Sequence, residues 1–424
     1  MKAFEIVLLH PSARMAVRLP PLALAPDQIS DAGFLIQGVR AAHGVESVVL
    51  KRLGARRGAD RRFETYRYAL AALSPELPAG LTWAAGPDAE GALQQAEAVR
   101  ADQPWASPGW WPEMHRWIGA ACAQAGLSQM ARLTQVRAWD LSSVVEAQLR
   151  SGEILYYKAV PRAFGSEPGL TAWLESLAAD AGSSGRGPRV VAVDPEHRGM
   201  LLRACEGERL DAVTDLASWE RALCDYAALQ QTCAPYVDQL AARGLPRRSL
   251  EWLPGAWERL LADERCLQPG GHNDLTDAEV ASLRTAGAAR MSDWKETLGG
   301  LQVPDTLEHG DFHALNAFVD ATGTRVIDWT DASIAHPFFS LACFLRSQPH
   351  GPELSGRLAA AYLSCWTTHA PRAALIASVP AVMGLGAVFQ AVHYRERIRP
   401  LIDTYQEIRS AIPGYAREIL QRKY

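Results

Sequence analysis

Residues 307–342 have the sequence LEHGDFHALNAFVDATGTRVIDWTDASIAHPFFSLA, and this stretch decides the fold of the chain. Two short strand-like runs, residues 317–319 and 325–327, flank DATG, a sequence of the kind that tight turns prefer. The pattern predicts a β-hairpin. Antiparallel partners lie about 5 Å apart, so we expect Asn316, just before the first strand, and Asp328, just after the second, to meet at the open end of the hairpin.

The polar residues around this hairpin suit phosphoryl transfer. Asn316 and Asp328 would offer an amide oxygen and a carboxylate, the hard oxygen ligands that Mg²⁺ takes together with waters and phosphates. Asp311 lies on the preceding loop and is not needed as a ligand, so it could accept a proton from a substrate hydroxyl. Phosphoryl transfer requires little else from a protein beyond positioning and charge neutralisation. The residues therefore predict transfer of a phosphoryl group from a nucleotide.

The spacing of these residues resembles a known family. HGDxxxxN at 309–316, IDW at 327–329 and HP at 336–337 are similar to the signature of the aminoglycoside phosphotransferase and choline kinase-like family, small-molecule relatives of protein kinases. The resemblance implies a bilobal protein kinase-like fold with ATP and Mg²⁺ as cofactors. It also implies a role for each matching residue: Asp311 as catalytic base, Asn316 and Asp328 as metal ligands, and His309 as a support for the catalytic loop.

One position departs from the family pattern. Relatives usually carry an aspartate three residues beyond the proline, where it braces the catalytic loop, and this chain has Ser340. A hydroxyl can accept a backbone hydrogen bond but lacks the charge assistance of a carboxylate. The difference puts the rigidity of the loop in question, whereas the base and the metal ligands are present.

Two plainer interpretations compete with this one. His309 and His313 have the spacing of a metal pair on a helix, but Gly310 lies between them and no glutamate follows His309, as a zinc hydrolase would need. Asp311 and Asp328 are also residues that turns favour. Their combination with an asparagine around one hairpin favours the phosphotransferase interpretation over both.

Residues 127–206 are expected to form the small lobe, a five-stranded antiparallel sheet. Lys158 lies in the third strand on an otherwise apolar face, so it needs anionic partners, which the phosphates of ATP and a carboxylate would supply. We choose Glu167, at the start of the next helix, over Glu175, because Glu175 points away from the buried face of that helix. Capping of the helix dipole is an alternative role for Glu167.

The remaining nucleotide contacts are assigned by their order along the chain. Kinases place glycines in the loop before the second strand, over the phosphates, and this chain has none there. Backbone and hydroxyl donors of Ser142 and Ser143 would have to serve instead. After the fifth strand, residues 204–207 are expected to form the hinge between the lobes, where backbone groups would meet adenine, and Arg203 and Cys205 are candidate nucleotide contacts. The mostly helical large lobe would span residues 207–424.

Residues 1–103 alternate strand-like and helical segments and predict a small α+β domain. Their order resembles a Nudix domain, but residues 34–45 lack the acidic metal ligands of the Nudix helix, so the resemblance implies a scaffold or binding module. Lysine and arginine residues cluster at 51–62, which suggests a phosphate-binding loop or, as the simpler alternative, a solvated surface. Residues 104–126 begin with PWASPGWWP and predict a stiff joint followed by a helix.

The composition of all 424 residues suits two or three domains of a globular protein. A net charge of −4 argues against a general nucleic-acid binder. Seven scattered cysteines without a CxxC pair fit a reducing cytoplasm, and the N-terminal residues lack the pattern of a signal peptide. The uncharged residues 373–392 are long enough for a membrane span, but their content of Ala, Gly, Pro and Gln favours buried helices.

Together these residues predict an α+β enzyme, an ATP- and Mg²⁺-dependent kinase that phosphorylates a hydroxyl group of a small molecule. The alternative is a catalytically weak, pseudokinase-like nucleotide-binding or regulatory protein, which Ser340 and the glycine-free loop would explain. The acceptor, the choice of ATP or GTP and the oligomeric state stay open, because one fold hosts many substrates.

Overall fold

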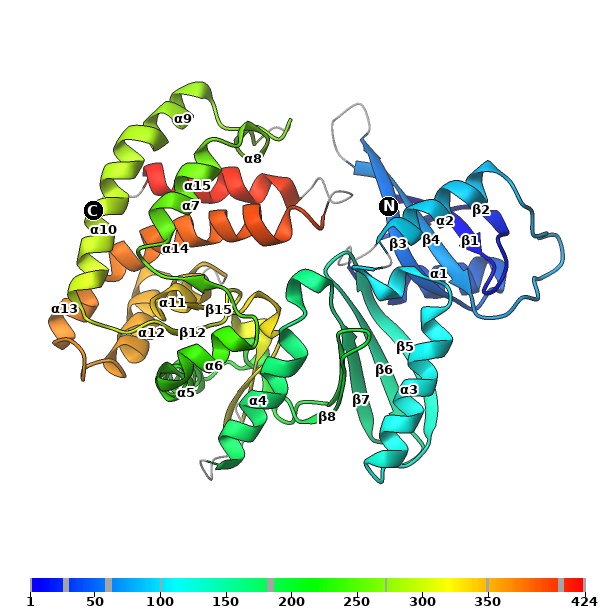
Figure 1. Cartoon of the computed structure of the whole chain (residues 1–424), viewed down its shortest axis with the longest axis horizontal. Helices are drawn as coiled ribbons and strands as arrows, with labels where there is room; N and C mark the ends of the chain where they lie inside the picture. Colours follow the sequence, from blue (N-terminus) through cyan, green and yellow to red (C-terminus); the bar gives the residue numbers. More distant parts are fainter. Residues whose placement is uncertain are drawn as a thin grey trace. The chain divides into compact units, whose positions relative to one another are not determined.

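The computed structural model describes residues 2–25, 30–57, 63–99, 101–180, 187–270, 273–347, 351–402 and 408–421 (Figure 1). The chain folds into two compact units. The first comprises Met1–Pro168, Val190–Ala204 and Leu401–Tyr405, and the second comprises Gly169–Arg189, Cys205–Pro400 and Gln406–Tyr424. Both units mix helices and strands, so the predicted α+β class is confirmed.

A four-stranded sheet forms the N-terminal part of the first unit. Its elements are β1 (Lys2–Leu9), β2 (Ala16–Leu24), α1 (Gly33–His43), β3 (Ser47–Arg57), β4 (Phe63–Ala72) and α2 (Pro87–Val99). The strand order is β2-β1-β4-β3, with β1 and β4 parallel and the other neighbours antiparallel. Alternation along β1 buries Phe4 and Ile6 in the core that α1 covers, and Val7 and Leu9 in the core that α2 covers. Both faces of the sheet are therefore apolar.

The basic cluster that begins at Lys51 is not a loop at its start, because β3 extends to Arg57. Lys51 and Arg52 are both buried. The guanidinium of Arg52 lies over the ring of Tyr66, 4.7 Å from its centroid. The phosphate-binding and the solvated-loop interpretations are therefore both wrong for these two residues, and residues 58–62 lie outside the described part of the chain.

The tryptophan-rich joint is fixed by packing, as the sequence predicts. A short 3-10 turn (Pro104–Ala106) and helix α3 (Trp110–Gln124) follow α2. Trp105 and Trp110 are buried in the core of the next sheet. Trp111 packs against that core and also against the core that α2 covers.

The second sheet of the first unit has five antiparallel strands, as predicted. They are β5 (Met130–Trp139), β6 (Ser142–Leu149), β7 (Ile154–Ala159), β8 (Val190–Asp194) and β9 (Gly199–Arg203). Their order is β5-β6-β7-β9-β8. Helix α3 runs along one face of this sheet (Figure 1), where Met114 and Ile118 share a core with Val145 and Leu155.

Strand β5 ties the two sheets of the first unit together. The side-chain amide of Gln135 accepts a hydrogen bond from Val49 N at 2.8 Å and donates one to Val49 O at 3.0 Å, so it takes the place of a strand beside β3. At the turn between β5 and β6, Lys51 Nζ lies 3.0 Å from Asp140 Oδ1, with side-chain exposures of 9% and 2%. A buried ion pair therefore holds the turn that precedes Ser142.

The second unit is mostly helical, and one apolar core runs through it. Two three-stranded sheets, β10-β13-β14 and β11-β15-β12, carry much of the segment at 307–342. The strands are β10 (Glu208–Arg209), β11 (Arg247–Arg248), β12 (Thr306–Glu308), β13 (Ala317–Asp320), β14 (Gly323–Val326) and β15 (Ser333–Ala335). Helix α4 (Glu167–Asp180) belongs to this unit apart from its first two residues. The other helices are α5 (Leu216–Cys233), α6 (Val237–Ala242), α7 (Leu253–Leu261), α8 (Glu264–Leu267), α9 (Asp277–Ser282), α10 (Ala288–Gly300), α11 (Phe338–Ser347), α12 (Pro352–Ser364), α13 (Arg372–Ala377), α14 (Val379–His393) and α15 (Ala411–Gln421).

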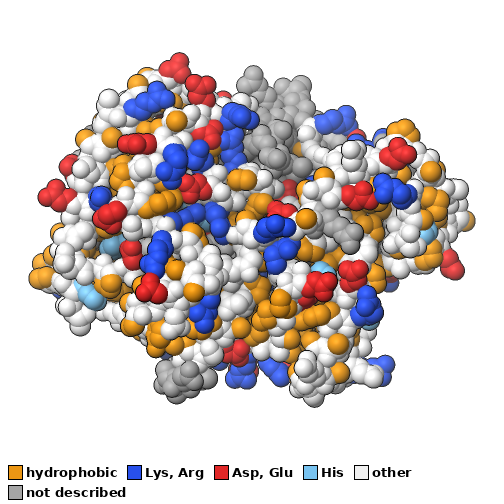
Figure 2. All heavy atoms as spheres, in the orientation of Figure 1, with side chains coloured by type: hydrophobic (Ala, Val, Ile, Leu, Met, Phe, Trp, Pro, Cys, Tyr) orange, Lys and Arg blue, Asp and Glu red, His pale blue; other side chains and the backbone are white. Residues whose placement is uncertain are grey.

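The uncharged residues 373–392 fold into α13 and α14, and α14 is buried from Ala381 to its end. In the part of the chain that the structure describes, no helix combines the length and the apolar character that crossing a membrane requires. On the face shown in Figure 2, basic and acidic side chains are interspersed, in keeping with the small net charge.

We expect removal of Lys51 to cost several times more stability than removal of one partner of a surface ion pair. Lys51→Met leaves the carboxylate of Asp140 buried without its cation, and breaking a buried pair in this way costs about 3–5 kcal/mol. Arg14→Met is the matched control, because Arg14 and Glu97 pair at 2.8 Å with exposures of 65% and 53%, and such a pair contributes about 0–1 kcal/mol. Urea unfolding measures both changes, and equal losses of unfolding free energy would contradict the expectation.

Candidate active site

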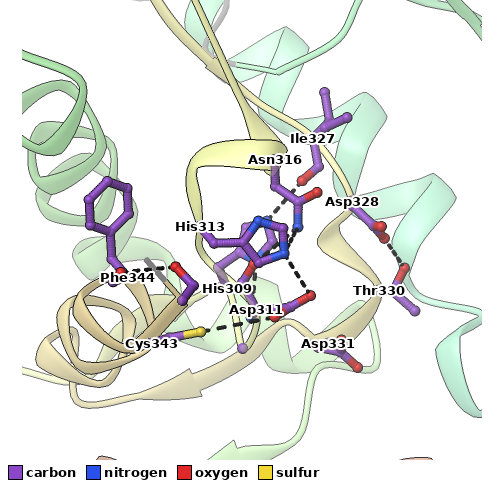
Figure 3. Close-up of polar contacts among 12 residues, drawn as sticks. His309, Asp311, His313, Asn316, Ile327, Asp328, Thr330, Asp331, Cys343 and Phe344 are labelled. Carbon is purple, nitrogen blue, oxygen red and sulfur yellow. Dashed lines mark hydrogen bonds and ion pairs between the residues drawn. The ribbon is translucent and has the colours of Figure 1, made fainter. Parts of the chain in front are cut away.

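Strands β13 and β14 form the hairpin that the sequence predicts. The ladder begins with Ala317 opposite Val326. One residue further out, Ile327 N donates a hydrogen bond to Asn316 O at 2.9 Å. Asn316 and Asp328 are therefore neighbours across the open end of the hairpin, as expected (Figure 3).

Hydrogen bonds and backbone conformation fix the side chains of Asn316 and Asp328. The amide nitrogen of Asn316 donates to Asp311 O at 3.1 Å, so its amide oxygen points to the other side, where Asp328 lies (Figure 3). Asp328 has a left-handed backbone with φ of 66°, an uncommon conformation that persists only where the surrounding structure enforces it. Thr330 Oγ1 donates to Oδ1 of this aspartate. The pair thus presents an amide oxygen and a carboxylate, a donor set that suits Mg²⁺.

His309 connects the loop that carries Asp311 with the hairpin. Asp311 N donates to His309 Nδ1 at 3.2 Å, which makes Nδ1 an acceptor and places the ring proton on Nε2. Nε2 then donates to Ile327 O at 2.9 Å. Burial lowers the pKa of His309, so the ring is neutral. Since both ring nitrogens bind backbone groups, the alternative of a His309–His313 zinc pair is wrong.

Asp311 is half exposed, with a side-chain exposure of 50%, and its carboxylate has two neighbours. Oδ2 lies 3.3 Å from His313 Nε2, and Oδ1 lies 4.0 Å from the thiol of Cys343. Burial lowers the pKa of His313, but the hydrogen bond with Asp311 and the charges of Asp311 and Asp328 outweigh it and raise the pKa. The contact between His313 and Asp311 was not predicted from the sequence, although the position of His313 two residues after the proposed base was a usable signal.

Gly310 allows the loop to approach its neighbours closely. Its φ is +83°, and a Cβ atom there would lie 2.5 Å from Asp331 O, so a side chain is excluded. Gln390 of α14 donates from Nε2 to Gly310 O at 2.6 Å. Gln390 fixes the loop from a helix about 80 residues away in the chain, and the local sequence gave no signal for it.

Ser340 lies beneath the loop and contacts a carboxylate that the sequence analysis missed. His309 N lies 3.5 Å from Ser340 Oγ, a long hydrogen bond. Ser340 Oγ donates to Glu308 Oε1 at 2.7 Å and lies 2.8 Å from the hydroxyl of Tyr226. Burial raises the pKa of Glu308 to about 7, against the opposing effects of the Ser340 hydroxyl and the Gly310 N–H. A glutamate directly before the HGD loop was the available signal.

In the first unit, Lys158 and Glu167 form the pair that the sequence predicts. Lys158 Nζ lies 2.6 Å from Glu167 Oε1, with side-chain exposures of 11% and 0%. Lys158 extends from β7, and Glu167 is the first residue of α4. The buried pair therefore joins strand and helix.

The other residues expected to contact the nucleotide make structural contacts. Ser142 Oγ accepts a hydrogen bond from Trp139 Nε1 at 3.0 Å. Ser143 is fully buried, and its hydroxyl lies 3.4 Å from Arg137 O within the sheet. Arg203 pairs with Glu153. Burial raises the pKa of Cys205 to about 11, so the thiol stays protonated at neutral pH.

Comparison with known proteins gives one family match and several similar structures. The profile described as Phosphotransferase enzyme family matches residues 159–375. No curated protein matches the sequence. Among solved structures, a macrolide 2'-phosphotransferase from Brachybacterium faecium is 18% identical over 70% of this chain and 98% of its own, with a TM-score of 0.47. A putative fructosamine-3-kinase from Thermobifida fusca is 18% identical over 72% and 99%, with a TM-score of 0.47. The GDP and kanamycin complex of APH(2")-IIia is 14% identical over 72% and 98%, with a TM-score of 0.49.

The family match begins directly after Lys158 and ends in α13. It includes the loop with Asp311 and the hairpin with Asn316 and Asp328. Because the match spans these residues and just over half of the sequence, the chain belongs to the phosphotransferase enzyme family.

Proposed function

We propose that this phosphotransferase is a kinase that uses ATP and Mg²⁺ to phosphorylate a hydroxyl group of a small molecule. The arrangement of Asp311, Asn316 and Asp328 around one hairpin end carries the proposal. The half-exposed carboxylate of Asp311 lies near the side-chain oxygens of Asn316 and Asp328. The neutral His309 ring links the loop of Asp311 to the hairpin. Phosphoryl transfer needs this combination of a positioned base and a cation site.

Asn316 and Asp328 are the proposed metal ligands. Their donors fit Mg²⁺, because the Asn316 amide nitrogen is engaged by Asp311 O and the amide oxygen is thereby directed to the side of Asp328. ATP and Mg²⁺, when bound, supply the phosphoryl group and neutralise its charge. The protein holds the two ligand oxygens in place through the backbone bond between Ile327 and Asn316.

Asp311 is the proposed base. Its exposure allows a substrate hydroxyl to approach, and its backbone N–H is fixed by His309. The carboxylate would orient the hydroxyl and accept its proton. The neighbouring His313 has a raised pKa, so in its protonated form it would place a positive charge 3.3 Å from the base.

Lys158 is the proposed contact to the α and β phosphates of the nucleotide, and Glu167 holds it in place. Backbone groups near Arg203 and Cys205 are the proposed contacts to adenine. The Ser142 hydroxyl accepts a hydrogen bond from Trp139 and keeps its own proton, so it is a proposed donor to a phosphate oxygen. Ser143 does not enter the proposal as a hydroxyl donor, because it is fully buried in the sheet. The scattered cysteines support a cytoplasmic location.

The first experiment is transfer of the γ-phosphate of labelled ATP, with Mg²⁺, into a cell metabolite extract. We expect a labelled product with the wild-type protein and none with Asp328→Ala, because that variant lacks the carboxylate ligand. The product would also identify the acceptor. Binding of ATP that Asp328→Ala weakens, with no transfer by the wild type, would instead support a pseudokinase-like nucleotide-binding protein.

Asp311→Asn should abolish most of the turnover and leave the fold intact. Loss of a general base lowers kcat by about 10²–10⁴-fold, whereas a half-exposed side chain contributes little to packing. Asp293→Asn makes the same chemical change at an exposed site of α10 and should keep wild-type kcat. Steady-state kinetics and thermal unfolding of both variants provide the comparison. Full turnover by Asp311→Asn would show that another group is the base.

Lys158→Met should cost both stability and nucleotide affinity, and the two effects can be separated. The single variant leaves Glu167 buried without its ammonium partner, which should lower the free energy of unfolding by about 3–5 kcal/mol. The double variant Lys158→Met with Glu167→Leu replaces the pair by apolar groups and should recover most of that stability. Both variants lack the ammonium group, so ATP binding measured by calorimetry should be roughly 10- to 100-fold weaker in each. Wild-type affinity in the double variant would argue against a phosphate contact by Lys158.

A further inference from the structure

A carboxylate is buried directly below the catalytic loop. Glu308 ends strand β12, has no exposed surface and precedes His309 in the chain. Among the described residues, no lysine, arginine or histidine forms an ion pair with it within 4 Å, and its Oε2 atom has no hydrogen-bond partner. A carboxylate in this setting costs stability, and an apolar side chain would be more favourable for the core alone.

The contact between Glu308 and Ser340 determines what the serine hydroxyl can do. A hydroxyl has one proton and two lone pairs. Ser340 gives its proton to Glu308 Oε1 at 2.7 Å, so both lone pairs face the other neighbours as acceptors. His309 N, 3.5 Å away, and the hydroxyl of Tyr226, 2.8 Å away, are the two donors.

Tyr226 extends this network to the loop from a second direction. Its ring stacks on Phe312 with centroids 3.9 Å apart, and Phe312 lies between Asp311 and His313. The hydroxyl of the same tyrosine is bound by Ser340. The network therefore holds the loop at the backbone of His309 and at the side chain of Phe312, on both sides of the proposed base.

We propose that Glu308 and Ser340 act together as a positioning pair for the catalytic loop, with the carboxylate orienting the hydroxyl that receives the His309 N–H and the Tyr226 O–H. Neither residue contacts the reacting groups. The proposal rests on the proposed function to the extent that the loop carries the base. It assigns to the Glu308 carboxylate the task of fixing the acceptor that an aspartate at position 340 would otherwise supply directly.

An exchange of the two groups tests this assignment. In Glu308→Ala the hydroxyl proton of Ser340 loses its acceptor. In Ser340→Ala the His309 N–H and the Tyr226 O–H lose the serine oxygen as their acceptor. Ser340→Asp alone places two carboxylates in one buried site, where they cannot both ionise. The double variant Glu308→Ala with Ser340→Asp moves the carboxylate to position 340, where it can accept both hydrogen bonds directly.

We expect Ser340→Asp to lower kcat in the wild-type background and to raise kcat in the Glu308→Ala background. Glu308→Ala, Ser340→Ala and Ser340→Asp should each lower kcat by roughly 10- to 100-fold with the KM for ATP little changed. The double variant should return to within about threefold of the wild type. Ser333→Ala is the matched control, because Ser333 is equally buried, pairs with Glu308 in the β12–β15 ladder and has an unbonded hydroxyl among the described residues. Its kcat should be unchanged.

Hydrogen exchange of the peptide that contains residues 307–316 gives a readout that does not depend on turnover. Exchange should be faster in the three single variants and return to the wild-type rate in the double variant. If the wild type transfers no phosphate, the proposed function fails while this exchange pattern still tests the pair. A double variant that exchanges or turns over no better than Ser340→Asp would overturn the proposal, and so would wild-type kcat in Glu308→Ala.

Discussion

The geometry of the site depends on the two hydrogen bonds of the His309 ring. One ring nitrogen accepts the N–H of Asp311, and the other donates to the carbonyl group of Ile327. The proposed base and the end of the hairpin that carries the proposed metal ligands are thus fixed to the same rigid group. Because burial keeps the ring neutral, these bonds form without placing a charge in the core. Moving either the loop or the strand would break a bond to this ring.

Side chains from helices satisfy much of the remaining backbone of this segment. Gln230 of α5 donates to Leu307 O at 3.1 Å and Pro337 O at 3.3 Å. Gln390 of α14 donates to Gly310 O at 2.6 Å. Asp225 of α5 accepts from the backbone and hydroxyl of Thr324 at 3.0 and 2.9 Å. Buried backbone groups need partners, and this loop, which forms few backbone pairs of its own, obtains them from polar side chains of α5 and α14.

Local patterns predicted the parts of the structure that depend on local chemistry. The hairpin followed from its turn residues, the five-stranded sheet from alternation and turns, and the Lys158–Glu167 pair from the position of one charge on an apolar face. Gln390 and Tyr226 were missed because their contacts with the loop, at Gly310 and Phe312, span 80 or more residues of chain, and helical periodicity only marks them as facing the core.

The basic cluster shows the opposite failure. Lys51 and Arg52 were expected to lie on a surface or to bind phosphate because charged residues near a glycine usually do. The structure buries both, since Asp140 and the ring of Tyr66 provide partners from other strands. Whether a charge is solvated depends on partners that lie far away in the sequence, and single-sequence reasoning has no access to them.

The serine at position 340 is a weaker argument for lost activity than its residue type suggests. What the loop needs is an acceptor for the His309 N–H that does not rotate away, and a hydroxyl fulfils this need only when its own proton is bound elsewhere. Glu308 binds that proton at 2.7 Å. Burial raises the pKa of this glutamate to about 7, so its charge is unfavourable in the core, and a protein that only bound nucleotide would be more stable with an apolar residue there. A buried carboxylate that orients Ser340 in this way fits an enzyme with a positioned loop better than a binding protein that has lost turnover.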